Sequence, residues 1–319
     1  MTDYNDYKKR LNELGSKKIP FLFVIDFEVE KFYITPFVQS DILFSIDGFT
    51  NVNYSHQNQQ PTIKKIPVSL DRYRLAFERV IQEIRIGNTY MLNLTFPTLI
   101  QSNISLLEIF LNSKALFKLY FQDKFITFSP ERFVKIENNM IKTYPMKGTI
   151  DASIPNAKER LLTNEKEHAE HNMVVDLLRN DLSIVAKKVM VNKFRYVNQI
   201  TAGPKNLLQV SSEISGILEP NWQQRVGDIL LPLLPAGSIS GTPKKKTLEI
   251  IKTVENYQRG FFTGIFGYFD GNKLDSAVMI RFIEKVDQQL IYKSGGGITI
   301  DSDLKTEYKE MLDKVYISF

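Results

Sequence analysis

Two pairs of glutamates stand at helical spacing in two distant parts of the chain. Glu167 and Glu170 are three residues apart, and so are Glu307 and Glu310. Residues three apart lie on one face of a helix, so each pair can present two carboxylates in one direction. Carboxylate oxygens suit Mg²⁺, which takes one or two of them together with water and substrate oxygens. The two pairs could converge on one magnesium ion, or each could lie on a solvent-exposed helix face, which is the commoner outcome for this spacing.

A glutamate and a lysine flank a predicted β-hairpin. Glu131 precedes the strand-like run RFVKIE, and Lys147 follows the next strand-like run, MIKTYP. If these runs form a hairpin, their outer ends meet and the two side chains share one neighbourhood. An amine is a nucleophile only when neutral, and a carboxyl group with a raised pKa can donate a proton. The pair could act in this way, although a lone lysine and glutamate more often form a surface ion pair.

Two glycine-rich segments precede predicted helices, SGGGITIDSD and PAGSISGTPKKKTLEII. Glycine permits tight turns in which backbone N–H groups closely approach an anion. Neither segment matches the G-x-x-x-x-G-K-[ST] pattern of a phosphate-binding loop. Anion-binding turns and ordinary turns between strand and helix both remain open on this evidence.

The composition excludes several classes of site. The 319 residues include no cysteine and three histidines, so disulfides, thiolate nucleophiles and cysteine-ligated metals are ruled out. The net charge is +5, but lysine and arginine are spread along the chain, which does not indicate nucleic-acid binding. The N-terminus is polar, and the apolar runs GDILLPLLPAG and GFFTGIFGYF are too short to span a membrane. We therefore expect a cytoplasmic protein that binds neither nucleic acid nor membrane.

Periodicity predicts the elements that position these side chains. Apolar residues at helical spacing predict helices over 69–87, over 164–189 and from Asp303 onward. β-Branched and aromatic runs predict many strands, among them 19–28, 89–100 and the continuous run SAVMIRFIEKV. Strands and helices do not alternate regularly, and there is no internal repeat and no G-x-G-x-x-G. This pattern predicts an α+β fold with large antiparallel sheets.

Nine segments between Gly87 and about Lys314 carry a combined signal: GNTYMLNLT, SPERF, PMKGT, EHAEHNMVVDLLRNDL, VSSEISG, PAGSISGTPKKKTLEII, RGFFTGIFGY, IRF and GGGITIDSDLKTEYKEMLDK. In this order they resemble the chorismate-utilising enzymes, which include anthranilate synthase component I, aminodeoxychorismate synthase component I, isochorismate synthase and salicylate synthase. The resemblance implies a two-lobed α/β sandwich with the active site between two sheets. It also indicates a chorismate-binding catalytic domain over 69–319, with 1–68 as a reduced N-terminal segment packing on it.

The resemblance implies roles for named residues. Mg²⁺ is expected on Glu170 and Glu310, with Glu167 and Glu307 in support, where it would grip the ring carboxylate of chorismate. The expected substrate-binding residues are Arg281, Lys314, Thr149, Gly295, Gly296 and Gly297.

The residue at position 147 favours one branch of the family. Anthranilate and isochorismate synthases resemble P-x-A-G-T, and aminodeoxychorismate synthases resemble P-I-K-G-T, whereas this chain has PMKGT. The resemblance then implies that Lys147 attacks C2 of chorismate as the 4-hydroxyl leaves, and that ammonia adds at C4. Glu131 would be the general acid and base. The product would be 4-amino-4-deoxychorismate, for p-aminobenzoate and folate synthesis, with ammonia from a glutamine amidotransferase subunit.

Three positions bear on the alternatives. Met91 matches the position at which the isochorismate and salicylate synthases of the family carry a lysine base. Gln209 replaces a histidine frequent in the family, and Phe262 replaces a substrate-binding tyrosine of anthranilate synthases. Because few residues precede the first motif, we expect no regulation by tryptophan. Anthranilate synthase component I or another chorismate-utilising enzyme is the main alternative, and a non-catalytic anion-binding homologue is the third.

Overall fold

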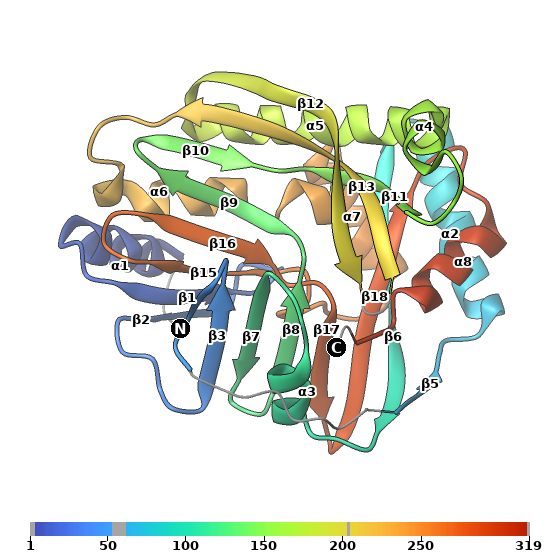
Figure 1. Cartoon of the computed structure of the whole chain (residues 1–319), viewed down its shortest axis with the longest axis horizontal. Helices are drawn as coiled ribbons and strands as arrows, with labels where there is room; N and C mark the ends of the chain where they lie inside the picture. The colour runs from blue at the N-terminus through green and yellow to red at the C-terminus, as the bar shows by residue number, and fades with distance from the viewer. Residues whose placement is uncertain (1–3, 53–61, 203–204, 318–319) are drawn as a thin grey trace.

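Two nine-stranded antiparallel sheets make up the body of the molecule, with helices around them (Figure 1). The structure is a computed structural model that describes residues 4–52, 62–202 and 205–317. The predicted α+β class with large antiparallel sheets is confirmed. Within the described ranges, no helix combines the length and the apolar character needed to cross a membrane.

The first sheet runs across the view of Figure 1. The strand predicted at 19–28 is its β1, whose residues are all buried between β15 and β2. The strand order is β11 (Met146–Asp151), β13 (Lys205–Ile217), β10 (Met140–Thr143), β9 (Arg132–Glu137), β16 (Leu274–Val278), β15 (Ile265–Phe269), β1 (Phe21–Ile25) and β2 (Phe32–Thr35), with β12 (Lys187–Ala202) also paired to β13.

The second sheet runs down the same view, so the two sheets cross. The strand predicted at 89–100 is its β6, which pairs with β18 over nine residues. The strand order is β14 (Gly241–Thr242), β6 (Met91–Ser102), β18 (Gln289–Ile298), β17 (Phe282–Val286), β8 (Phe125–Ser129), β7 (Phe117–Phe121), β3 (Ile42–Ile46) and β4 (Phe49–Thr50), with β5 (Ile63–Ile66) also paired to β6.

The three predicted helices are present, and each starts at a polar side chain. Ser69, Asn164 and Asp303 each accept a hydrogen bond from a backbone N–H of the first turn, which would otherwise be unpaired. The helix predicted to end at 189 stops at Val185, because the chain from Lys187 joins β12. The helices are α1 (Tyr4–Ser16), α2 (Leu70–Arg85), α3 (Leu106–Asn112), α4 (Ala157–Thr163), α5 (Glu165–Val185), α6 (Val226–Leu230), α7 (Lys244–Val254) and α8 (Leu304–Asp313), with short 3₁₀ turns η1 (Trp222–Arg225), η2 (Leu231–Leu233) and η3 (Gly237–Ile239).

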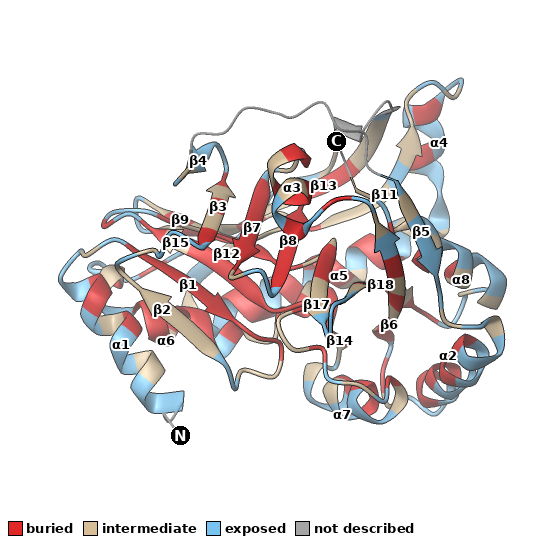
Figure 2. Cartoon of the chain, turned by 90° about the horizontal axis from the view of Figure 1, so that it is seen from below, coloured by how far each residue is buried: buried red, intermediate tan, exposed pale blue. Residues whose placement is uncertain are grey.

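Burial follows the sheets. Figure 2 shows buried residues along β1, β7 and β8 and exposed residues on the outer side of α1. One apolar cluster is rich in phenylalanine and includes Phe262, whose ring lies 5.9 Å from that of Phe282. Phe262 is 2% exposed. Phe262, which stands in place of a substrate-binding tyrosine of anthranilate synthases, is therefore a residue of the packed core.

The chain passes from one sheet to the other where the sequence predicts one continuous strand. That prediction over SAVMIRFIEKV is wrong, because β16 ends at Val278 in the first sheet and β17 begins at Phe282 in the second. Arg281 has φ 54°, a left-handed conformation that is uncommon for a residue other than glycine. This break places Arg281 at the junction between the sheets.

Candidate active site

Helices α5 and α8 bring the two glutamate pairs together. Lys166 Nζ lies 3.2 Å from Glu307 Oε1 and 3.9 Å from Glu170 Oε1, so one ammonium group links the two helices. Both carboxylates are buried, Glu170 with 8% exposure and Glu307 with 4%. Ser302 Oγ donates a further hydrogen bond to Glu307 Oε1, at 2.8 Å. The pairs therefore face each other rather than lying on separate exposed surfaces.

The other member of each pair lies in the same charged region. Glu310 Oε1 is 2.6 Å from Lys314 Nζ, which also donates to the carbonyl oxygen of Gly295 at 2.9 Å. Partial desolvation acts to raise the pKa of Glu310, whose side chain is 49% exposed, but the positive charges of Lys314, Lys147 and Lys166 together hold the pKa below its ordinary value. The pKa of Glu167 is raised by burial and by the negative charge of Glu170. The surroundings thus favour the protonated form of Glu167 on α5 and the ionised form of Glu310 on α8.

The donors suit a hard divalent cation. Carboxylates of two helices approach one another, and Mg²⁺ is bound by one or two such groups plus water and substrate oxygens. In the part of the chain that the structure describes, no group of three or more acidic, histidine or cysteine side chains is already assembled as a metal cluster. The negative charge is instead balanced by lysines, with Lys147, Lys166 and Lys314 each within ion-pair distance of a glutamate. The residues fit Mg²⁺ with few protein ligands.

Three consecutive glycines form a floor under these side chains. The prediction that they form a turn is wrong, because all three lie within β18, paired with β6. A Cβ atom added at Gly296 would lie 3.5 Å from Glu310 Oε1 and 3.6 Å from Lys314 Nζ. A Cβ at Gly297 would lie 3.2 Å from Lys147 Nζ. Because glycine has no side chain, this part of β18 leaves space for the lysine and glutamate side chains.

The glycines differ in what a side chain would meet, which gives a stability prediction. A Cβ at Gly295 would lie 2.2 Å from the carbonyl oxygen of Leu94, a backbone atom that cannot swing away. We expect Gly295→Ala to lower the free energy of unfolding by about 3 kcal/mol, as overpacking does. Gly296→Ala meets only side-chain ends at ordinary contact distance and should remain near wild type. Urea unfolding of both variants measures this, and equal losses would contradict the assignment of a backbone clash.

Lys147 is the second residue of β11. The predicted β9–β10 hairpin is present, and β11 continues along the same edge of β13 beyond β10. Lys147 Nζ lies 3.6 Å from Glu170 Oε2, and its side chain is 22% exposed. The amine therefore sits between the carboxylates of α5 and the glycine floor of β18.

Glu131 precedes β9 and accepts a hydrogen bond from Ser238 Oγ, in η3. Burial raises the pKa of Glu131. The Ser238 hydroxyl and the positive charges of Lys147, Arg281 and Lys314 act in the opposite direction, because each favours the ionised carboxylate. A carboxyl group of raised pKa thus lies within the field of the same cations that surround the glycine floor.

The remaining predicted substrate contacts divide into two kinds. The guanidinium carbon of Arg281 lies 5.1 Å from the centre of the Tyr316 ring, and its buried Nε has no hydrogen-bond partner among the described residues. Such a donor suits an anionic ligand, since an unpaired buried N–H is costly. Thr149 is exposed on β11 opposite Gln209, and Gly148 with φ 79° separates it from Lys147. A Cβ added at Gly148 would lie 3.2 Å from Glu167 Oε2, so this part of β11 borders the carboxylates, whereas Thr149 itself is exposed.

Two site residues were missed in the sequence. Lys166 lies four residues before Glu170, a spacing that predicts an ion pair on a helix, so the signal was available. Ser238 lies inside the segment PAGSISG, where the glycines predict a turn but no local pattern indicates that the serine hydroxyl contacts Glu131.

The chain is similar to known proteins along most of its length. Residues 39–318 match the family model described as chorismate binding enzyme. An "Uncharacterized PabA-like protein" of Pasteurella multocida is 51% identical over 97% of this chain and 97% of its own length. Aminodeoxychorismate synthase component 1 of Bacillus subtilis is 31% identical over 78% of this chain, which spans 55% of that relative.

Two further matches show how broad the similarity is. Anthranilate synthase component 1 of Archaeoglobus fulgidus is 32% identical over 77% of this chain and 61% of its own length. Among solved structures, a 2,3-dihydroxybenzoate-specific isochorismate synthase of Bacillus anthracis has a TM-score of 0.76 at 20% identity, covering 98% of this chain and 88% of that one. At that identity the solved structure supports the fold alone.

Proposed function

Because the chain belongs to the chorismate-binding enzyme family, we propose that it aminates chorismate at C4 and yields 4-amino-4-deoxychorismate. The observation that carries the proposal is the amine of Lys147, which lies 3.6 Å from Glu170 and directly over Gly297. A nucleophile on the protein allows two successive displacements, the second of which places nitrogen at C4. Without such a nucleophile, ammonia would add directly at C2. The assignment of chemistry rests on this residue.

In the proposed reaction, Lys147 Nζ forms a bond to C2 of the ring. The two ring double bonds shift, the C4–O bond breaks, and Glu131 protonates the departing hydroxyl so that it leaves as water. Ammonia then forms a bond to C4, the double bonds shift back, and the C2–N bond to Lys147 breaks. The ammonium group formed at C4 gives up one proton, which Glu131 takes up, so that Glu131 is restored as the acid and Lys147 leaves as the neutral amine it was at the start.

The substrate's two carboxylates need cationic partners. We assign one to Arg281 and Lys314: Arg281 has a buried Nε without a hydrogen-bond partner among the described residues, and Lys314 contacts the glycine floor through the carbonyl oxygen of Gly295. Mg²⁺, held by Glu170 and Glu310 with Glu167 and Glu307 in support, would supply positive charge for the ring carboxylate and fix the ring's orientation. Ammonia is assigned to a glutamine amidotransferase subunit, since this chain has no cysteine to serve as an amidotransferase nucleophile.

Withholding ammonia tests the covalent step. With chorismate and Mg²⁺ but no ammonium, the second displacement cannot proceed, so the Lys147 adduct should accumulate. Mass spectrometry of a peptide digest is expected to locate chorismate, less the elements of water, on Lys147. An unmodified Lys147 in an enzyme that turns over once ammonium is added would remove this residue from the mechanism.

The pH dependence of kcat follows from Glu131. A general acid acts only when protonated, so the rate falls as the pH rises through its pKa, and burial moves that fall to higher pH than an ordinary glutamate gives. Glu131→Gln cannot lose this proton. We expect it to lower kcat about 10²- to 10⁴-fold and to abolish the alkaline fall. A variant whose profile keeps the same alkaline fall would show that another group is titrating.

Anthranilate synthase activity is the second candidate, because relatives of that name match at 32% identity. Amination at C2 with release of pyruvate is its signature. The presence of Lys147, rather than the alanine of P-x-A-G-T, favours the first candidate.

A further inference from the structure

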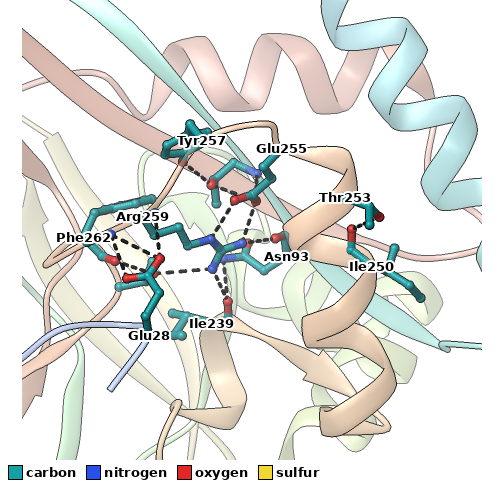
Figure 3. A network of polar contacts seen from close by, with 12 residues as sticks. Glu28, Asn93, Ile239, Ile250, Thr253, Glu255, Tyr257, Arg259 and Phe262 are labelled. Carbon is teal, nitrogen blue, oxygen red and sulfur yellow. Dashed lines mark hydrogen bonds and ion pairs between the residues drawn. The ribbon is translucent and has the colours of Figure 1, made fainter. Parts of the chain in front are cut away.

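A fully buried arginine lies behind the proposed active site and is not accounted for by the reaction. Arg259 is 1% exposed, and its guanidinium points toward Glu255, Asn93 and Ile239 (Figure 3). Its Nε donates to Glu255 Oε2 at 2.9 Å, and its Nη2 lies 2.6 Å from Glu255 Oε1. The guanidinium also donates to two main-chain carbonyls, from Nη1 to Ile239 O at 2.9 Å and from Nη2 to Asn93 O at 2.6 Å, and makes a longer contact of 3.4 Å from Nη1 to Thr263 Oγ1.

The first carbonyl, that of Ile239, belongs to the turn that contacts the proposed general acid Glu131. Ile239 is the last residue of η3, and Ser238 of this turn donates its hydroxyl hydrogen bond to Glu131. A turn of three residues has little hydrogen bonding of its own, so its position depends on outside contacts. Arg259 supplies one of these, and the Asn93 side-chain amide supplies another by donating to the same Ile239 oxygen at 3.1 Å.

The second carbonyl leads to the nucleophile. Asn93 lies in β6 opposite Gly297 of β18, and Gly297 is the glycine over which Lys147 Nζ lies. Glu255 holds the same strand two residues on, since its Oε1 accepts hydrogen bonds from the N–H and hydroxyl of Thr95 at 2.9 and 2.8 Å. The Glu255–Arg259 pair therefore contacts both the turn behind Glu131 and the strand that supports the floor under Lys147.

This arrangement uses a property specific to arginine. Its planar guanidinium carries five donors in a fixed fork, whereas a lysine ammonium is a single point of donation. A buried ion pair contributes little net stability compared with packed apolar residues of similar volume, because both charges lose water. We propose, resting on the function proposed above, that Arg259 is a positioning residue that fixes the distance between the general acid Glu131 and the nucleophile Lys147.

Arg259→Lys tests the proposal while keeping the buried charge beside Glu255. The substrate-binding cations Arg281 and Lys314 are unchanged, so KM for chorismate should stay near wild type while kcat falls about 10²-fold. The hydrogen bond from Ser238 favours the ionised form of Glu131 and so lowers its pKa. Loosening η3 weakens this bond, so the pKa of Glu131 should rise and the alkaline fall of kcat should move to higher pH. The charges that face Glu131 from other elements, Lys147, Arg281 and Lys314, stay in place.

A double-mutant cycle tests whether Arg259 acts through Ser238. Ser238→Ala should shift the alkaline fall in the same direction, and adding Arg259→Lys to it should cost much less than in wild type. Trp222→Phe is the control for lost stability, since that fully buried ring packs against Phe269 in another part of the core. It should lower the melting temperature without moving the pH profile.

The outcomes separate this inference from the proposed function. Wild-type product identity tests the reaction, whereas the pKa of Glu131 can be followed without turnover by ¹³C NMR, with Glu131→Gln for assignment. Should Arg259→Lys not fold, Asn93→Ala removes the other side-chain donor to Ile239 and should raise the same pKa. Strictly additive effects of Arg259→Lys and Ser238→Ala, or an unmoved Glu131 pKa in the folded variants, would overturn the positioning role.

Discussion

Lys147→Ala should lower kcat for C4 amination of chorismate by at least about 10³-fold, because the proposed route loses its nucleophile rather than a binding contact. Alanine is also what the P-x-A-G-T members carry at this position, so the substitution is compatible with the fold. The measurement is chromatographic quantification of 4-amino-4-deoxychorismate from chorismate, Mg²⁺ and ammonium. Undiminished amination at C4 by a folded Lys147→Ala protein would contradict covalent catalysis.

A control separates the loss of the nucleophile from the loss of charge. Lys147 is an ion-pair partner of Glu170, at 3.6 Å, so its removal also changes the electrostatics of the carboxylates. Lys147→Arg keeps a positive charge but cannot act as a neutral amine near neutral pH. It should bind Mg²⁺ like wild type and be as inactive as the alanine variant. Substantial activity in Lys147→Arg would indicate that the charge alone suffices.

Glu170→Gln and Glu310→Gln should each weaken Mg²⁺ binding about 10²-fold or more, because each removes one of the anionic groups that we propose hold the ion in a site with few protein donors. Isothermal titration with Mg²⁺ in the presence of chorismate measures this without turnover. Activity should fall in parallel and recover in part at high Mg²⁺ concentration.

Glu165→Gln is the matched control for the metal prediction. Glu165 is an exposed residue in the first turn of the same helix, α5, so its substitution changes the net charge equally. It should leave Mg²⁺ affinity unchanged at moderate ionic strength, where exposed charges are screened. Equal weakening by Glu165→Gln and Glu170→Gln would point to a general charge effect instead of direct ligation.

Local features of the fold could be predicted from the sequence because local interactions determine them. Asn164 and Asp303 cap the two glutamate-bearing helices, and both caps were readable as polar residues ahead of a periodic apolar pattern. The alignment of Glu167 with Glu170 follows from helix geometry in the same way. This spacing could not show that Lys166 of α5 contacts Glu307 of α8, a residue 141 positions further along the chain.

Features that depend on the crossing of the two sheets could not be predicted from local pattern. The run around Arg281 has the composition of one strand, and only the passage from β16 to β17 requires its left-handed backbone. The sequence pattern predicts a turn at the three glycines of β18, because glycine is usually unfavourable inside a strand. Their place in the sheet has a tertiary cause, namely the proximity of Lys147, Glu310 and the backbone of β6. Likewise, Arg259 begins the segment RGFFTGIFGY, but its contacts with Ile239 and Asn93 join residues far apart in the chain and have no local signal.

The most direct test of the central claim is the identity of the product formed by the wild-type chain from chorismate, Mg²⁺ and an ammonium salt. The arrangement of Lys147, Glu131 and the glycine floor predicts nitrogen at C4, with the enolpyruvyl group still attached. Nitrogen at C2, or release of pyruvate to give anthranilate, would contradict it.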